Sequence, residues 1–362
     1  MKDCDNQMVL MAYKLILGRE PENDAVLQRH FANVEDLRRF FLCSPEFINS
    51  SIANEIHLAR EGGGYHLSLS PPNVGFNQIK TFEQYDDFIK SAIQANLDPQ
   101  MLSTYKLDFE EFVKLYGTSP PCCDPFSDEY RDWELSFFQF LSGQEYCVEK
   151  EGQHFNVELE KLKPPTLGQS IDKRAESNHN YMEMLKRTRL KRGLRVLEMG
   201  FGHGNLLELL GRTGFQVSGI DASKEFVEYS KWRLESQNIN ANLICGSFYD
   251  VGNFDDLFDV VIFESSFHHC GDPVRLFNKL NTKLASKGRV IFLRDGIYFN
   301  ADRPWGVICH DGASIFQIRH RGWMELGYRR DFFEELLKRT GFKLCGVYPM
   351  SNGIALYEAV KV

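Results

Sequence analysis

From about Lys186 onward, short apolar runs alternate with amphipathic stretches. This alternation is typical of β-α-β winding and predicts an α/β fold with a mostly parallel, Rossmann-like sheet. Pro349–Gly353 separates the last two runs and is too short for a crossover helix, so the last strand is expected to be antiparallel. The seven expected strands are Leu194–Met199, Gln216–Asp221, Asn242–Cys245, Asp259–Glu264, Arg289–Leu293, Phe342–Tyr348 and Ile354–Val360.

The first part of the chain has a different pattern, with apolar residues at helical spacing. Val9 and Tyr13 belong to a set that falls largely on one side of a helix. Gly18 can end that helix and Pro21 can open the next one. Residues 1–60 are therefore expected to form a small all-α domain.

Two connector-like segments follow, Glu61–Tyr65 with three glycines and Ser68–Pro72 with two prolines. Such sequences are typical of linkers. We expect residues 61–160 to form this linker and a helical extension that packs on the α/β domain. The α/β domain itself is expected to span residues 161–362.

Composition narrows the classes of function. The 362 residues are 43% hydrophobic and carry a formal net charge of −8, without a long basic tract, so nucleic acid is not an expected partner. No apolar run approaches the roughly 20 residues that a membrane helix needs. Met1–Asn6 lacks the basic and apolar regions of a signal peptide. A cytoplasmic protein without a membrane span is expected, with its nine cysteines reduced.

The first expected strand runs directly into a glycine turn. Gly200, Gly202 and Gly204 allow the backbone to turn tightly and to approach a ligand closely. A dinucleotide-binding fingerprint shares this arrangement, but here Asn205 stands where that pattern has glycine or alanine. Glu198, two residues before the first glycine, suits the positively charged methionine end of S-adenosylmethionine and would repel a pyrophosphate. The turn therefore indicates S-adenosylmethionine as the cofactor.

Further cofactor residues follow the second and third strands. Asp221 ends the second strand and is placed to accept hydrogen bonds from two ribose hydroxyls. In this order, the strands, the glycine turn and the two acids resemble class I S-adenosylmethionine-dependent methyltransferases. Many members of that family have an acid near the adenine, where this chain has Ser247. We expect Ser247 to bond the exocyclic amine and Phe248 or Tyr249 to pack on the ring.

The turn after the fourth strand carries the candidate catalytic groups Glu264, His268 and His269. It resembles the turn beside the methyl group in small-molecule methyltransferases, including their paired histidines. Methyl transfer to a hydroxyl needs close positioning of the reactants and a base. Alternatively, the histidines order the loop and Glu264 binds the cofactor through its backbone. No metal is expected, because adjacent histidines at a helix start point in different directions and no other ligand cluster is visible.

A long insertion, from Arg294 to Gly327, separates the fifth and sixth strands. Its flat aromatic and charged side chains fit stacking on a sugar ring or binding of an anionic acceptor. The alternative is a folded flap whose aromatic residues form core. The candidate acceptor-binding residues are Trp305, His310, Arg319, Arg321 and Trp323.

Two resemblances indicate a biological setting. Leu17–Pro21 and Ser44–Phe47 resemble a short helical domain that accompanies bacterial glycosyltransferases and methyltransferases of surface-polysaccharide synthesis. The insertion, with Asp124–Tyr130 and Trp133, resembles methyltransferases linked to glycan modification. These resemblances imply O-methylation of a sugar or glycan acceptor and an association with glycosyltransferases. The alternatives are a methyltransferase for a small metabolite or lipid precursor, or a non-catalytic S-adenosylmethionine-binding subunit of a glycan-synthesis complex.

Overall fold

The structure is a computed structural model that describes residues 76–163, 171–298, 307–309, 311–350 and 355–362, together with isolated earlier positions. The chain divides into two compact units, residues 1–73 and 74–362. In the first unit the described positions Val9 and Phe41 are helical and buried, and the rings of Tyr13 and Phe41 meet edge to face at 4.8 Å. These observations agree with a helical N-terminal region.

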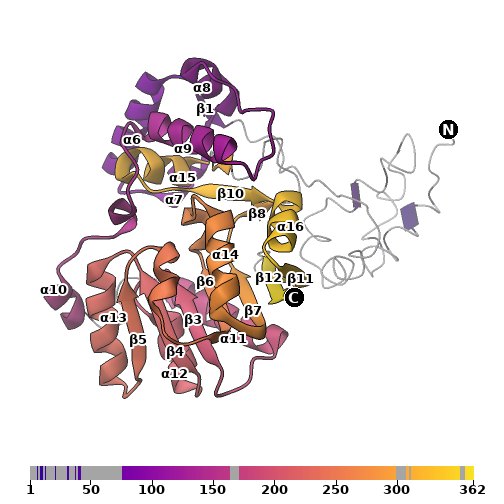
Figure 1. Cartoon of the computed structure of the whole chain (residues 1–362). Helices are drawn as coiled ribbons and strands as arrows, with labels where there is room; N and C mark the ends of the chain where they lie inside the picture. The colour runs from indigo at the N-terminus through magenta and orange to yellow at the C-terminus, as the bar shows by residue number, and fades with distance from the viewer. Residues whose placement is uncertain are drawn as a thin grey trace. The chain divides into compact units, whose positions relative to one another are not determined.

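The second unit is built on a seven-stranded sheet with the order β11-β12-β7-β6-β3-β4-β5 (Figure 1). Its strands are β3 (Arg195–Met199), β4 (Gln216–Asp221), β5 (Ala241–Cys245), β6 (Phe258–Glu264), β7 (Leu284–Leu293), β11 (Phe342–Pro349) and β12 (Ala355–Lys361). Neighbouring strands are parallel except at β12, which is antiparallel to both β7 and β11. The expected seven strands and the antiparallel last strand are confirmed.

Helices cover both faces of this sheet, so that it is the middle layer of three (Figure 1). On β3, Val196 belongs to one hydrophobic core and Leu197 and Met199 to the other, as the alternation of side chains along a strand requires. The first core includes side chains of α11 (Ile171–Thr188), α12 (Asn205–Arg212) and α13 (Lys224–Ser236). The second includes side chains of α14 (Pro273–Lys283) and α16 (Arg330–Arg339).

The segment before the sheet is mainly helical, as expected, with one short parallel strand pair that the pattern did not predict. Its helices begin at capping side chains: Ser127, for example, accepts a hydrogen bond from the backbone N–H of Tyr130 at the start of α9. The elements are β1 (Asn77–Ile79), α6 (Phe82–Gln94), α7 (Pro99–Ser103), β2 (Tyr105–Leu107), α8 (Phe109–Tyr116), α9 (Asp128–Ser142), η2 (Val148–Glu151) and α10 (Val157–Leu162).

The insertion after β7 folds against this segment. It contains β8 (Ile297–Tyr298), β9 (Val307–Ile308), α15 (Gly312–Phe316), η5 (Gln317–Arg321) and β10 (Leu326–Arg329), with the three strands in the order β8-β10-β9. The hydroxyl of Tyr85 in α6 donates to the carbonyl of Ile315 in α15 at 2.6 Å. We call residues 76–151 and 311–329 together the cap, which lies beyond one end of the main sheet (Figure 1).

The remaining short elements are single helical turns at the ends of strands, η3 (Phe248–Asn253) after β5 and η4 (Phe267–His269) after β6. Among the helices that the structure describes, none is long and apolar enough to cross a membrane.

Candidate active site

A pocket of about 270 Å³ lies where the sheet meets the cap. This volume is close to the lower end of the range usual for small-molecule sites, roughly 300 to 1,000 Å³. Its walls come from the glycine turn, from the turns after β4, β5 and β6, and from the cap. The lining residues are Tyr146, Val148, Glu151, Gln153, Gly200, Gly202, Asp221, Ala222, Phe226, Gly246, Ser247, Phe248, Tyr249, Ser265, Ser266, His269 and Trp323.

The glycine turn has the backbone conformation that only glycine adopts easily. Gly200, Gly202 and Gly204 have φ values of +74°, +51° and +69°. A Cβ on Gly200 would lie 2.8 Å from the Cβ of Ser266. A Cβ on Gly202 would instead point into open space, with no atom within 4 Å. Because Gly202 lines the pocket, this open space is where a bound cofactor can approach the backbone.

Asp221 fixes the turn and faces the same pocket. One carboxylate oxygen accepts a hydrogen bond from the N–H of Gly202 at 2.8 Å, and the other accepts from the N–H of Ser223 at 2.9 Å. Burial raises the pKa of Asp221, although these two hydrogen bonds oppose the change. Each oxygen keeps a lone pair that a ribose hydroxyl can use.

The expected adenine residues also line the pocket, with one difference in detail. The N–H and hydroxyl of Ser247 both donate to Asp250, each at 2.8 Å, so the hydroxyl proton is already used within the η3 turn. The hydroxyl oxygen can then only accept, which suits an exocyclic amine. Phe248 and Tyr249 stand beside it on the pocket wall.

Glu198, Gly204, Glu264 and His268 are not among the residues that line the pocket. Glu198 is 2% exposed, and burial, together with the nearby charges of Glu264 and Asp221, raises its pKa well above the usual range. Glu264 forms an ion pair with Arg294. Burial raises the pKa of Glu264 and the Arg294 charge opposes that change. The two acids therefore lie outside the pocket wall, and a direct contact with the reactants stays a prediction.

His268 is held in one orientation by an acid that the sequence analysis did not single out. A carboxylate oxygen of Asp295 accepts from the N–H groups of Ser266 and Phe267 at 3.0 and 2.8 Å. The same oxygen lies 3.0 Å from Nδ1 of His268. Because a carboxylate accepts, this contact assigns the proton to Nδ1 and leaves Nε2 as the free nitrogen. Nε2 lies 3.8 Å from the carboxylate of Glu325.

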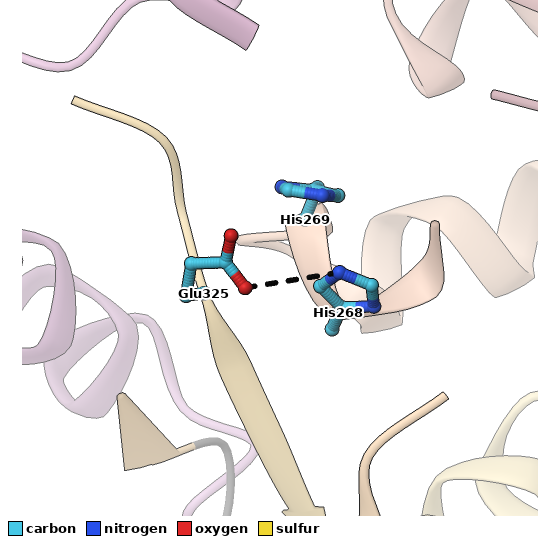
Figure 2. A group of neighbouring side chains, drawn as sticks. All are labelled: His268, His269 and Glu325. Carbon is cyan, nitrogen blue, oxygen red and sulfur yellow. Dashed lines mark ion pairs between the residues drawn. The ribbon is translucent and has the colours of Figure 1, made fainter. Parts of the chain in front are cut away.

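His269, the neighbouring residue, lines the pocket and lies among carboxylates. Its Nδ1 is 3.1 Å from a carboxylate oxygen of Glu151 in η2, but the two atoms are not aligned as a hydrogen bond. Burial alone would lower the pKa of His269, yet the contact with Glu151 and the charges of Glu325 and Asp295 outweigh it and raise the pKa to about 9. Figure 2 shows both histidine rings near the Glu325 carboxylate.

The predicted acceptor-binding residues separate into three groups. Trp323 lines the pocket, with its ring edge to face with His269 at 5.8 Å, and Arg321 lies over that indole at 4.7 Å. Arg319 instead forms an ion pair with Asp86 at 2.9 Å, inside the cap. The two others, Trp305 and His310, lie outside the described residues.

Several residues of the site were not predicted from the sequence. Glu151 lies in a charged stretch, Val148–Glu151, that gives no local sign of a site. Asp295 offered a weak sign, as an acid just after the fifth strand of the sheet, where ligands collect. Ser265 and Ser266 lie between Glu264 and the paired histidines and follow from the same turn.

Comparison with known proteins agrees with this geometry. Residues 197–292 match the family model of a methyltransferase domain. The match begins in β3 and ends in β7, and it includes the glycine turn, Asp221 and both histidines. It confirms the prediction of a methyltransferase domain. The cap and the N-terminal region lie outside the matched residues.

The curated relatives are similar to the methyltransferase domain only. A ubiquinone biosynthesis O-methyltransferase from Coxiella burnetii is 28% identical over 101 residues, which are 28% of this chain and 43% of that protein. One from Rhizobium etli is 29% identical over 135 residues, 37% of this chain and 53% of that protein. The chain thus spans about half the length of these relatives.

Solved structures show weaker likeness. A SAM-dependent methyltransferase from Aquifex aeolicus is 17% identical, with a TM-score of 0.41, covering 58% of this chain and all of that one. This likeness is too low to carry an argument about function.

Proposed function

We propose that the protein is an S-adenosylmethionine-dependent O-methyltransferase whose acceptor is a hydroxyl of a sugar or glycan. The observation that carries the proposal is the orientation of His268. Asp295 holds its Nδ1, so that the free Nε2 faces Glu325 beside the pocket. An imidazole fixed in this tautomer is suited to accept the proton of a hydroxyl. In many enzymes a third group, often a carboxylate, orients the base that removes the proton.

The pocket residues fit the cofactor. The open space at Gly202 admits a ligand close to the backbone, and Asp221 offers lone pairs to ribose hydroxyls. Ser247 and Phe248 would hold the adenine. The cofactor supplies an activated methyl group, and the remaining task of the protein is to place an acceptor oxygen in line with it. The proton of the acceptor hydroxyl passes to Nε2 of His268, and Asp295 stabilises the charged ring.

A flat aromatic surface supports a sugar as the acceptor. Trp323 closes the pocket beside His269, and Tyr146, Glu151 and Gln153 line the adjoining wall. An apolar face for stacking beside polar groups for hydroxyls suits a sugar ring. His269 and Arg321 bring positive charge to the same wall, which favours an acceptor with a phosphate or carboxylate nearby.

A second candidate acceptor is a small metabolite or lipid precursor with an aromatic hydroxyl. It is favoured by the similarity of residues around the glycine turn to proteins named ubiquinone biosynthesis O-methyltransferases. Trp323 and Tyr146 could equally pack against such a ring. The third reading, a binding subunit without turnover, requires that no acceptor takes up label.

The deciding experiment incubates the full chain with methyl-labelled S-adenosylmethionine and, in separate reactions, nucleotide sugars, fractionated glycans, lipid precursors and aromatic metabolites. We expect label in a sugar-containing fraction. His268→Ala should lower the turnover by roughly 10²- to 10⁴-fold, the usual contribution of a base, with little change in cofactor affinity.

His154→Ala is the matched control, because the His154 side chain is 82% exposed and also lies against a glutamate, Glu225. It should leave turnover unchanged. Label only in aromatic metabolites would replace the sugar with the second candidate. Cofactor binding without transfer to any fraction would remove the enzyme proposal for this chain.

Residues 1–60, for which the sequence predicts helices, belong to the same proposal, as a docking unit for a glycosyltransferase of glycan synthesis. Co-purification of the full chain with such an enzyme, lost when residues 1–60 are removed, would support this association. Equal recovery with and without these residues would contradict it.

A further inference from the structure

The two histidines of η4 do not stand alone. The structure brings Glu325 to them from the residue that precedes β10, and one ligand atom from each of the three side chains lies within 4.8 Å of the other two (Figure 2). Nε2 of His268 and an oxygen of Glu325 are 3.8 Å apart. Ligand atoms around one tetrahedral ion with bonds of about 2.0 to 2.2 Å lie roughly 3.3 to 3.6 Å apart. The cluster therefore reaches binding distance after its side chains move closer by roughly 1 Å.

His268 is oriented as a metal-binding histidine usually is. Its Nδ1 faces the buried carboxylate of Asp295 at 3.0 Å, and that carboxylate is itself fixed by the N–H groups of Ser266 and Phe267. Histidine ligands commonly donate their second ring proton to a carboxylate in this way, which fixes the tautomer and raises the basicity of the other nitrogen. The free Nε2 then faces the Glu325 carboxylate, on the side where an ion would bind.

The cluster also contains buried polar atoms that lack hydrogen bonds. Nδ1 of His269 and Oε2 of Glu151 are buried and lie 3.1 Å apart as an ion pair, but among the described residues neither has an aligned hydrogen bond. The other oxygen of Glu151 accepts from the N–H of Met324 at 2.9 Å, which holds this carboxylate in place. Buried polar atoms without partners are rare in native structures and call for an explanation such as a bound ion.

The balance of charge points the same way. Three carboxylates, those of Glu151, Asp295 and Glu325, lie around the two imidazoles. Within the described part of the chain, their only ion-pair partners are the histidines themselves. Imidazoles bind a metal ion in their neutral form, and a divalent cation would then supply the positive charge that these buried carboxylates need.

We propose that His268, His269 and Glu325 form a binding site for one divalent transition-metal ion, with the Glu151 carboxylate beside it. Two imidazoles and a carboxylate suit zinc, cobalt or iron, whereas magnesium and calcium prefer oxygen ligands alone. A set of three protein ligands leaves a position open for a substrate oxygen. Glu325 belongs to the distant insertion, so the sequence around the adjacent histidines gives no sign of this third side chain.

For its role in catalysis, this inference rests on the proposed function. The acceptor hydroxyl would occupy the open position, where the ion lowers the pKa of that hydroxyl. The hydroxyl loses its proton to Glu151 or water, the methyl carbon leaves sulfur and bonds the oxygen, and the ion keeps its oxidation state. In the loaded enzyme His268 is a ligand, and the ion then takes over the activation that His268 gives in the metal-free enzyme.

Binding is tested first, without reference to activity. The full chain is stripped with a chelator, titrated with Co²⁺, and followed by the visible absorption of the ion and by elemental analysis for metal content. We expect one ion per chain with histidine-type absorption bands. Glu325→Gln keeps the size of the side chain and should abolish or strongly weaken binding, and Asp295→Asn should weaken it by roughly 10- to 100-fold through the orientation of His268.

The control is again His154→Ala, which removes an exposed histidine beside a glutamate and should not change Co²⁺ binding. His269→Ala tests the second imidazole, and thermal unfolding establishes that each variant is folded. Binding of Co²⁺ to the wild type no tighter than to folded Glu325→Gln would overturn the proposal. Equal loss in His154→Ala would do the same, because it would indicate adventitious surface binding.

Activity then separates this inference from the proposed function. If an acceptor is methylated at the full rate after chelator treatment and metal analysis finds no ion, the metal site is wrong and the O-methyltransferase stands. If one ion binds at the three residues but no fraction takes up label, the metal site stands and the proposed function fails.

Discussion

At the cofactor end of the pocket, the parts that face the ligand are close in sequence. Gly202 and Asp221 are 19 positions apart, and the hydrogen bond between them joins a turn and a strand end of two neighbouring parallel strands. At the opposite end, where we propose that the acceptor binds and which we call the acceptor end, Glu151 and Met324 are joined by a hydrogen bond across 173 positions. The first end is one supersecondary unit, whereas the second is assembled from the cap and the turns after β6 and β7.

Because of this difference, substitutions at the two ends of the pocket are expected to have different effects. The cofactor end depends on backbone conformation, because φ values and N–H groups make the cradle. The acceptor end depends on side chains that different segments bring together. Substitutions at the first should therefore act on cofactor affinity, and those at the second on acceptor affinity or turnover.

The largest expected effect on cofactor affinity is at Gly202. In Gly202→Ala the positive φ strains the backbone by roughly 1–2 kcal/mol, which the folded protein can tolerate. The added methyl group, however, enters the space that the cofactor needs. We expect cofactor affinity, measured by calorimetry, to fall by roughly 100-fold, which corresponds to about 2.7 kcal/mol.

Gly193→Ala is the control for Gly202→Ala, since Gly193 also has a positive φ, +85°, and open space around its Cβ, but does not line the pocket. It should show similar destabilisation with unchanged cofactor affinity. Equal affinity losses in both variants would mean that strain, and not occupation of the cradle, is responsible.

A smaller effect is expected at Trp323. Trp323→Ala removes the flat wall beside His269, and we expect the KM for the acceptor to rise by roughly 10-fold, about 1.4 kcal/mol, with cofactor affinity almost unchanged. Steady-state kinetics with the acceptor varied at saturating cofactor measures this change. Trp232→Ala, on the exposed face of α13, is the control and should change neither constant. A loss confined to cofactor affinity would place Trp323 at the wrong end of the pocket.

The smallest effect on catalysis is expected at Arg319. This guanidinium pairs with Asp86, donates to the carbonyl of Leu141 at 3.2 Å and lies over the ring of Phe82 at 5.1 Å, so it ties the two segments of the cap together. Arg319→Ala should lower the free energy of unfolding by about 1–3 kcal/mol, as for hydrogen bonds to charged groups, and leave the KM for the acceptor nearly unchanged.

Denaturant unfolding and acceptor kinetics, measured together, check the Arg319 prediction. Arg321→Ala is the comparison, because Arg321 lies on the indole of Trp323 and should alter the acceptor KM. A stable Arg319→Ala protein with a raised acceptor KM would return Arg319 to the acceptor site that the sequence pattern assigned to it.

Most of the fold was readable from the sequence, because buried strands and the glycine turn leave local patterns. All seven strands, the reversed last strand and Asp221 could be predicted in this way. The acceptor end could not be predicted, since Glu151, Asp295 and Glu325 come together only where the cap packs on the sheet. Nothing near Arg319 in sequence distinguishes a residue that binds an acceptor from one that pairs with Asp86 across 233 positions.

The place of β12 in the sheet has a consequence for synthesis of the chain. This strand follows β11 in the sequence but lies between β7 and β11, where it pairs with both. Until residues 355–361 have left the ribosome, β7 and β11 have no bridge between them, and each has an open edge that can pair with another chain. The sheet can therefore join β7 to β11 only after β12 is inserted between them. A chaperone is expected to bind the nascent chain in that interval.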